Sequence, residues 1–194
     1  MGRVSEKTGE DVFIQGLVCT APYALPDFGK TKEAILLGIA KDGGRNSKMY
    51  MKQLIDGFVP PLLTYLRYLK PRAVAFIPPT AERKVQLMDE IKKQFCEISE
   101  LPIINIRKKY YGDVPRQQKH LSNIRDRVQN ADKTFFPDKT DREYNSVLLI
   151  DDMIGSGASL NQVAKKLINQ NSAKRVYGIG IVGDQKGFTT VKKV

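Results

Sequence analysis

The chain has 194 residues, of which 41% are hydrophobic and 27% charged, a composition that suits one folded domain and excludes disordered and collagen-like chains. Its formal net charge of +11 favours anionic partners such as nucleic acid or a polyphosphate metabolite, unless the basic surface serves solubility alone. The longest apolar stretch, 34–40, is too short to span a membrane, and two cysteines with one histidine exclude a disulfide framework and a zinc site. We therefore expect a single cytoplasmic domain, 1–194, without a membrane partner.

The first seventy residues are predicted to form structural elements that support the fold and carry no functional motif. Residues 12–19 predict a short strand, and 20–29, which contain two prolines and a glycine, predict a loop. Apolar residues then recur at helical spacing, which predicts three helices, over 34–42, 47–58 and 60–69. Pro60–Pro61 is expected to separate the second from the third, because proline breaks a helix interior but suits a first turn. The third helix is expected to pack against a sheet or against a second copy of the chain, so a homodimer is one expectation.

From Arg72 onward, short apolar runs alternate with helical patterns. The predicted strands are 73–77, 102–106, 146–150 and 175–183, and the predicted helices are 81–96 and 159–169. Such alternation predicts an α/β fold with a largely parallel central sheet flanked by helices. The long basic segment 107–145 shows no clear periodicity, and loops of that length inside a domain are usually functional or disordered.

The informative stretch is 146–160, SVLLIDDMIGSGASL. A buried-type strand is expected to end in Asp151 and Asp152, before a turn of small residues that opens a helix. The turn consists of Gly155, Ser156, Gly157, Ala158 and Ser159. Backbone N–H groups in such a turn, together with the helix N-terminus, suit a phosphate. Two carboxylates beside a phosphate need another partner, either sugar hydroxyls or a hard cation such as Mg²⁺. A phosphate site beside carboxylates that can bind sugar hydroxyls indicates a ribose 5-phosphate at the carboxyl edge of the sheet.

Competing interpretations of this stretch fit less well. A Walker A loop needs a Gly-Lys-Ser/Thr sequence, which is missing here, and a dinucleotide fingerprint places its glycines directly after the strand. The plain alternative is a strand that ends in a solvated aspartate pair before an ordinary helix.

The run LLIDDMIGSGAS resembles the phosphoribosyl-pyrophosphate (PRPP) motif of type I phosphoribosyltransferases. The resemblance implies that the turn holds the 5-phosphate, that Asp151 and Asp152 hold the ribose hydroxyls directly or through metal-bound water, and that Mg²⁺ is the cofactor. It also implies a pyrophosphate loop after strand 73–77. The residues at that place are Pro78, Pro79 and Thr80, with Arg83 nearby to supply positive charge.

A second pattern resembles the ComF branch of this family, which is linked to DNA uptake. It is the series Gln118, Leu121, Arg127, Asn130 and Phe135. The chain departs from ComF proteins in lacking an N-terminal four-cysteine zinc finger. It departs from purine-salvage members in carrying Gly155 where they place a catalytic acid, which disfavours purine salvage. The segments 1–30 and 184–194, where a hood over the acceptor is expected, match no known pattern, so the acceptor stays unidentified.

Two functions from different classes follow. In the first, the chain is a transferase in which an acceptor displaces pyrophosphate from PRPP, with Lys108 or Lys109 and Arg116 on the basic loop stabilising the leaving group. In the second, it is a non-catalytic module that binds PRPP or a nucleotide and uses the basic loop to engage single-stranded nucleic acid or a DNA-processing protein. The plain alternative for each basic residue is solvation of a loop.

Overall fold

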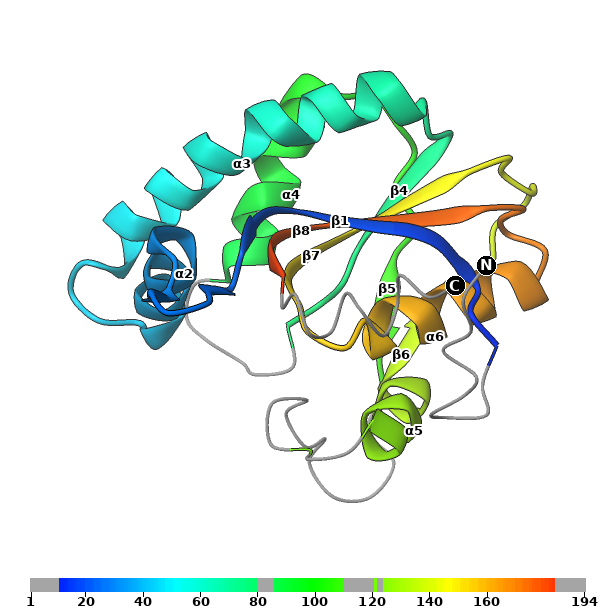
Figure 1. Cartoon of the computed structure of the whole chain (residues 1–194). Helices are drawn as coiled ribbons and strands as arrows, with labels where there is room; N and C mark the ends of the chain where they lie inside the picture. The colour runs from blue at the N-terminus through cyan, green and yellow to red at the C-terminus, as the bar shows by residue number, and fades with distance from the viewer. Residues whose placement is uncertain (1–10, 80–85, 110–120, 122–123, 184–194) are drawn as a thin grey trace.

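The computed structural model describes residues 11–79, 86–109, 121 and 124–183, and its centre is a four-stranded sheet (Figure 1). The strands, in spatial order, are β1 (Ile14–Pro22), β8 (Val176–Gly183), β7 (Val147–Ile154) and β4 (Ala73–Phe76). Every pairing among them is parallel. The predicted α/β fold with a parallel central sheet is therefore confirmed.

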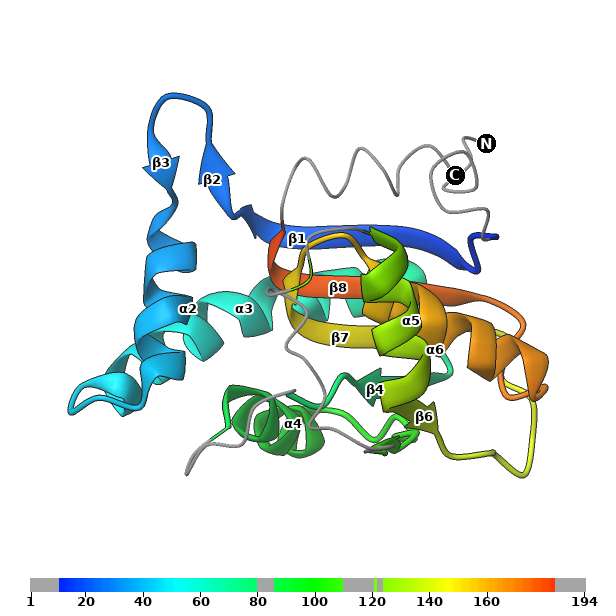
Figure 2. The same ribbon diagram turned by 90° about the horizontal axis from the view of Figure 1, so that it is seen from below.

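Helices cover both faces of this sheet. One face carries α2 (Lys32–Asp42), α3 (Ser47–Leu69) and α4 (Leu87–Ile98), and the other carries α5 (Ile124–Thr134) and α6 (Ala158–Asn169) (Figures 1 and 2). The central strand β7 packs against both layers, and its residues 147–150 are fully buried. A strand segment buried on both faces is apolar at each position, which is why the sequence alone located residues 147–150 of β7. None of the helices in the described part of the chain has the length and apolar character needed to cross a membrane.

Two adjoining helices were predicted where the structure has one, because α3 runs unbroken through Pro60 and Pro61. A proline inside a helix lacks the N–H that would bond the carbonyl four residues earlier. Here both prolines are exposed, and so are Asp56 and Gly57, so solvent can bond the freed carbonyls. The buried stripe of α3 continues on the opposite side of the helix, from Met51 to Leu62. Packing of that stripe outweighs the local cost of the prolines.

The structure also corrects the prediction for 102–145. The segment 102–106 is not a regular strand, because only Ile103 within it pairs with the sheet, as a single parallel bridge to Val74. The segment 107–145, predicted without regular structure, contains α5 and most of a small antiparallel pair, β5 (Ile106–Lys108) with β6 (Phe135–Pro137). The apolar stripe of α5 was too sparse to predict a helix, since its only buried apolar residues are Val128 and Ala131.

Boundaries near the site differ as well. The predicted loop 20–29 contains the end of β1 and a short hairpin, β2 (Ala24–Leu25) with β3 (Gly29–Lys30), which projects with α2 at one end of the sheet (Figure 2). Thr31 begins α2: its hydroxyl donates to the carbonyl of Pro22 at 2.7 Å and accepts from the N–H of Ala34 at 3.3 Å. The helix end at Gly43 is confirmed, with φ at +76°. These bonds tie the start of α2 to the carboxyl end of β1.

Candidate functional site

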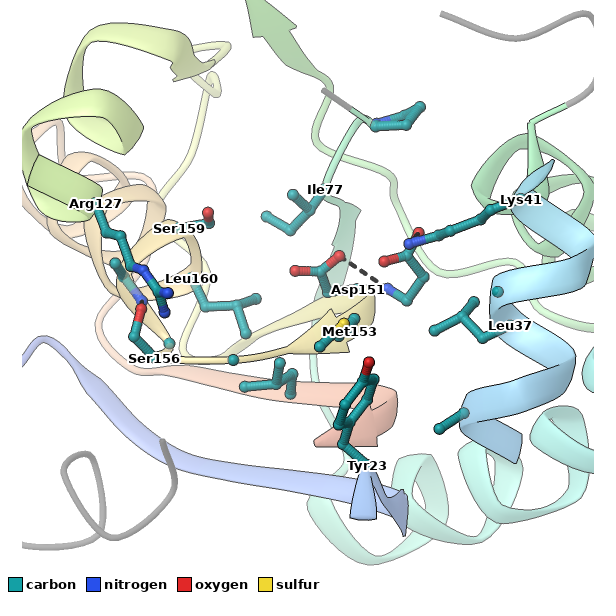
Figure 3. A pocket seen from close by; sticks show the side chains of 18 of the residues that line it. Tyr23, Leu37, Lys41, Ile77, Arg127, Asp151, Met153, Ser156, Ser159 and Leu160 are labelled. Atoms are coloured by element: carbon teal, nitrogen blue, oxygen red, sulfur yellow. Dashed lines mark hydrogen bonds and ion pairs between the residues drawn. The ribbon is translucent and has the colours of Figure 1, made fainter. Parts of the chain in front are cut away.

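A pocket of about 560 Å³ lies at the carboxyl ends of β1, β4 and β7. Its walls are the segment after β1 together with α2, the residues after β4, the end of β7 with the turn 155–159, and one side of α5 (Figure 3). The chain leaves β1 for α2 on one face and leaves β7 for α6 on the other, and such a divergence opens a crevice at the strand ends. The volume is in the range of pockets that hold small metabolites.

The turn 155–159 forms one wall of this pocket, and all five of its residues line it. Gly157 is the N-cap of α6 and has φ at +75°, a left-handed conformation that favours glycine. The hydroxyl of Ser156 accepts a hydrogen bond from the N–H of Ala158 at 3.4 Å. Because the first N–H groups of a helix have no intrahelical acceptor, the start of α6 presents donors and a positive dipole end at this wall.

The acidic pair lies within a strand and not after one. The predicted strand end at Ile150 is wrong, because β7 continues to Ile154 in register with β8, Asp151 opposite Gly180 and Ile154 opposite Gly183. Both carboxyl groups border the pocket. The Oδ1 atom of Asp151 accepts from the N–H of Asp152 at 2.8 Å, and Oδ2 of Asp152 is 2.7 Å from Nζ of Lys41.

Asp151 has an unusual protonation equilibrium. Burial raises the pKa of this carboxyl, the charge of Asp152 raises it further, and Lys41 with two backbone N–H groups lowers it, for a result of about 8. A cation or a set of hydroxyl donors would favour the ionised form of Asp151. Mg²⁺ in phosphate-binding sites is commonly held by one or two carboxylates together with ligand phosphates. Asp151 fits that role, and among the described residues no three His, Cys, Asp or Glu side chains gather to hold a metal by themselves.

Arg127 brings a positive charge to the turn 155–159. It lies on α5 and lines the pocket, where Figure 3 shows it beside Ser156 and across from Lys41 and Leu37. Its Nε donates to the carbonyl of Leu121 at 2.9 Å, and its Nη1 lies 4.0 Å from the Cβ that an alanine at 155 would have. Arg127 belongs to the series that resembles ComF proteins, but the sequence predicted no role for it in binding or catalysis.

The position of Arg127 depends on how α5 docks against α6. The link between the two helices is Lys166, whose Nζ donates to the carbonyls of Asp132 and Phe135 and lies 3.8 Å from the ring centroid of Phe136. Burial lowers the pKa of Lys166, while the nearby Asp132 carboxylate raises it. These contacts join the last turn of α6 to the C-terminal end of α5 and to β6, and so fix α5 alongside α6, with Arg127 in the first turn of α5 facing the turn 155–159.

Two solved structures are similar to this chain. One is an adenine phosphoribosyltransferase, with 15% sequence identity, a TM-score of 0.45 and coverage of 76% of this chain and 76% of that chain. The other is the adenine phosphoribosyltransferase from Leishmania tarentolae, with 13% identity, a TM-score of 0.37 and coverage of 74% of this chain and 73% of that chain. No protein-family model matches the sequence, and neither does any curated protein.

The other predicted site residues lie at different distances from the pocket. Pro78 and Pro79 line it, and Nζ of Lys108 donates to the carbonyl of Pro79 at 2.7 Å, so this lysine is tied to the loop after β4. Lys109 instead lies over the ring of Phe136, 5.2 Å from its centroid. Neither lysine is among the described residues that line the pocket. The catalytic role of the two lysines stays a prediction.

Three of the predicted residues, Thr80, Arg83 and Arg116, lie outside the described residues, and so do 1–10 and 184–194 of the expected hood. The described part of the first hood segment does reach the site, because Tyr23 and Lys30 line the pocket. The wall opposite the turn 155–159 comes from α2, through Leu37, Gly38 and Lys41. This helix was predicted as scaffold, and no local sequence signal marks Lys41 as a site residue.

Replacing Arg127 with glutamine tests the phosphate role predicted for the turn 155–159: binding of ribose 5-phosphate is expected to weaken about tenfold, because a charged hydrogen-bond donor beside a phosphate contributes on the order of 1.5 kcal/mol. Calorimetric titration at two salt concentrations measures the loss and the reduced salt dependence. Arg125→Gln is the matched control, since Arg125 lies on the same helix and is exposed. Equal effects of the two substitutions would remove Arg127 from the phosphate site.

Proposed function

We propose that the protein binds PRPP with Mg²⁺ in this pocket and transfers its ribose 5-phosphate to an acceptor, releasing pyrophosphate. The observation that carries the proposal is the meeting of Asp151 with the turn 155–159 at one pocket on the carboxyl edge of a parallel sheet. A phosphate-binding turn and a carboxylate in one pocket match the two ends of a phosphorylated sugar, its phosphate and its hydroxyls.

We assign each part of PRPP to one wall of the pocket. The turn and Arg127 would hold the 5-phosphate. The acidic pair at residues 151 and 152 would hold the ribose hydroxyls, directly or through metal-bound water. The pyrophosphate would lie toward Pro78 and Pro79, with Lys108 tied to the same loop. When bound, Mg²⁺ would neutralise part of the pyrophosphate charge, and Asp151 is the protein ligand that fits it best. The acceptor would enter along the wall formed by Tyr23 and Leu37.

In the proposed reaction, the acceptor nucleophile forms a bond to C1 of the ribose as the bond from C1 to pyrophosphate breaks, through an oxocarbenium-like transition state. Leaving pyrophosphate develops negative charge, which Lys108 or Lys109 and Arg116 are proposed to stabilise. The turn carries Gly155 where an acid would serve as a general base for a purine, so the acceptor is proposed to be something other than a salvaged purine.

The alternative function is a ComF-like module that binds PRPP or a nucleotide without turnover and engages nucleic acid. Its supports are the net charge of +11 and the series from Gln118 to Phe135, of which Leu121, Arg127, Asn130 and Phe135 lie in the described part of the chain. Arg127 and Phe135 also line the pocket, so this series contributes to the same site.

Calorimetric titration with PRPP in Mg²⁺, followed in the same sample by an assay for pyrophosphate across a panel of bases and single-stranded DNA, tests both functions. Binding with acceptor-dependent release would establish the transferase. Binding without release, together with DNA binding that falls with salt and is competed by PRPP, would favour the module. Failure to bind PRPP would overturn the proposal.

A further inference from the structure

The two adjacent carboxylates extend toward opposite faces of the sheet. In a strand, successive side chains alternate between faces. Asp152 shares its side with Leu148 and Ile150, which belong to the core beneath α2, α3 and α4. Asp151 shares its side with Leu149, which belongs to the core beneath α6. Asp151 pairs with Gly180 of β8 in register with the residues before it, so the alternation extends to the acidic pair, and it ends before Ile154, which joins the core beneath α6. The two carboxylates therefore reach the pocket from different sides of β7.

The Asp152 carboxylate, on the side of the sheet that α2 covers, already has a partner. Lys41, in the last turn of α2, places Nζ 2.7 Å from Oδ2 of Asp152, and the two side chains are only 26% and 12% exposed. Asp152 also borders a second, small cavity toward α4, lined in part by Leu87 and Met88. Figure 3 shows Asp151 in the middle of the main pocket and Lys41 at its α2 side. The ion pair therefore joins α2 to the sheet edge next to the ligand space.

We propose that the two carboxylates have separate duties: Asp151 binds the ribose hydroxyls, while Lys41 is a positioning residue that holds Asp152 on the α2 side and cancels its charge. The ribose duty of Asp151 rests on the proposed function. The counter-ion duty of Lys41 rests on the ion pair and on the alternation along β7.

The division has an electrostatic consequence for binding. PRPP carries phosphate groups at both ends, so an unpaired negative charge in the pocket opposes it, and the opposition is strong where water is scarce. Removing Lys41 leaves Asp152 as such a charge. Removing the charge of Asp152 as well removes its repulsion of PRPP. The free-energy cost of a partly buried ion pair is greatest when one partner is missing, because the other charge is then left unpaired.

A double-mutant cycle in the full-length protein tests this by calorimetry with PRPP in Mg²⁺. Lys41→Met is expected to weaken binding about tenfold. The double variant Lys41→Met/Asp152→Asn is expected to recover to within about threefold of wild type, a recovery that a merely structural role would not produce. Lys41→Arg, which conserves the charge, is expected to remain close to wild type. The loss of PRPP affinity from Asp152→Asn alone is expected to be at least about tenfold smaller than the loss from Asp151→Asn.

Lys52→Met is the matched control, because Lys52 forms an ion pair with Asp56 at the same 2.7 Å distance on exposed surface. It is expected to leave both PRPP affinity and the unfolding temperature near wild type. Equal losses from Asp151→Asn and Asp152→Asn would overturn the inference, and so would a double variant as weak as Lys41→Met.

Thermal unfolding of the ligand-free variants separates this inference from the proposed function. Lys41→Met and Asp152→Asn are each expected to lower the unfolding temperature, and the double variant is expected to lower it no further than the worse single change. Additive losses would overturn the counter-ion duty of Lys41. If wild type binds neither PRPP nor ribose 5-phosphate, the proposed function and the ribose duty of Asp151 fall, while the unfolding cycle still decides the duty of Lys41.

Discussion

Asp151→Asn is expected to weaken PRPP binding by about a hundredfold or more and, at the same time, to raise the unfolding temperature of the ligand-free protein. An asparagine keeps the size of the side chain but cannot offer two acceptor oxygens or a charge to hydroxyls or Mg²⁺. The additional change Asp152→Asn is expected to leave binding abolished and the fold intact. Loss of binding together with a gain of stability cannot result from misfolding.

The stability gain has a definite pH dependence. The folded-state pKa of Asp151, about 8, lies above its ordinary value of 3.8, so the folded protein binds this proton more tightly than the unfolded chain does. The wild type therefore loses stability as pH rises from about 4 to about 8. The advantage of Asp151→Asn should be absent near pH 4 and reach on the order of 2 kcal/mol, about 4–8 °C, above pH 8.

Thermal unfolding at pH 5, 7 and 9, with calorimetry of the same samples, measures both effects. Asp56→Asn is the control, because Asp56 is exposed, with a side chain 54% accessible, and lies on α3 away from the pocket. It should change neither quantity. A stability gain that is the same at all three pH values would contradict the assignment of the raised pKa to Asp151.

Gly157→Val is expected to reduce ribose 5-phosphate binding by about a hundredfold and to destabilise the fold by about 1–3 kcal/mol. Gly157 has φ at +75°, where a β-branched side chain is strained. Relief of the strain would move the N–H groups at the start of α6 away from the phosphate position. Calorimetry with ribose 5-phosphate and urea unfolding measure the two losses.

Asn171→Val is the matched control at the other end of α6. Asn171 also has a left-handed backbone, with φ at +56°, but it lies beyond the helix C-terminus and far along the chain from the turn. Valine there should cost similar stability, since asparagine tolerates this conformation and valine does not, and it should spare binding. If Asn171→Val weakened binding as much as Gly157→Val, general destabilisation and not the turn would explain the loss.

The turn 155–159 and the acidic pair could be singled out from sequence because the pattern that marks them is local. Asp151, Asp152 and the residues 155–159 follow one another within a few positions, and a buried strand before them fixes which edge of the sheet they reach. Strands β4 and β8 and residues 147–150 of β7 were recognisable for a related reason, since a strand segment buried on both faces carries few polar side chains.

Three features were decided by tertiary structure alone. The stripe of α3 packs strongly enough to carry the helix through Pro60 and Pro61, against the local rule. Helix α5 has few apolar residues, and its own sequence does not predict a helix; Lys166 and the core beneath α6 stabilise it. Pairing with β8 extends β7 past the acidic pair and sends the two carboxylates to opposite faces.

The sequence by itself determined the α/β class and predicted that the turn 155–159 and the acidic pair share one edge of the sheet, because both inferences depend on neighbouring residues and on periodicity. Tertiary structure decided which side chains complete that edge. Lys41 comes from a helix far from residue 152 in the chain, and nothing in the residues around it marks it. Arg127 belongs to the ComF-like series in the sequence, but that series does not predict its place in the pocket. Charges are brought together by packing between distant segments, and such packing leaves no pattern in the local sequence.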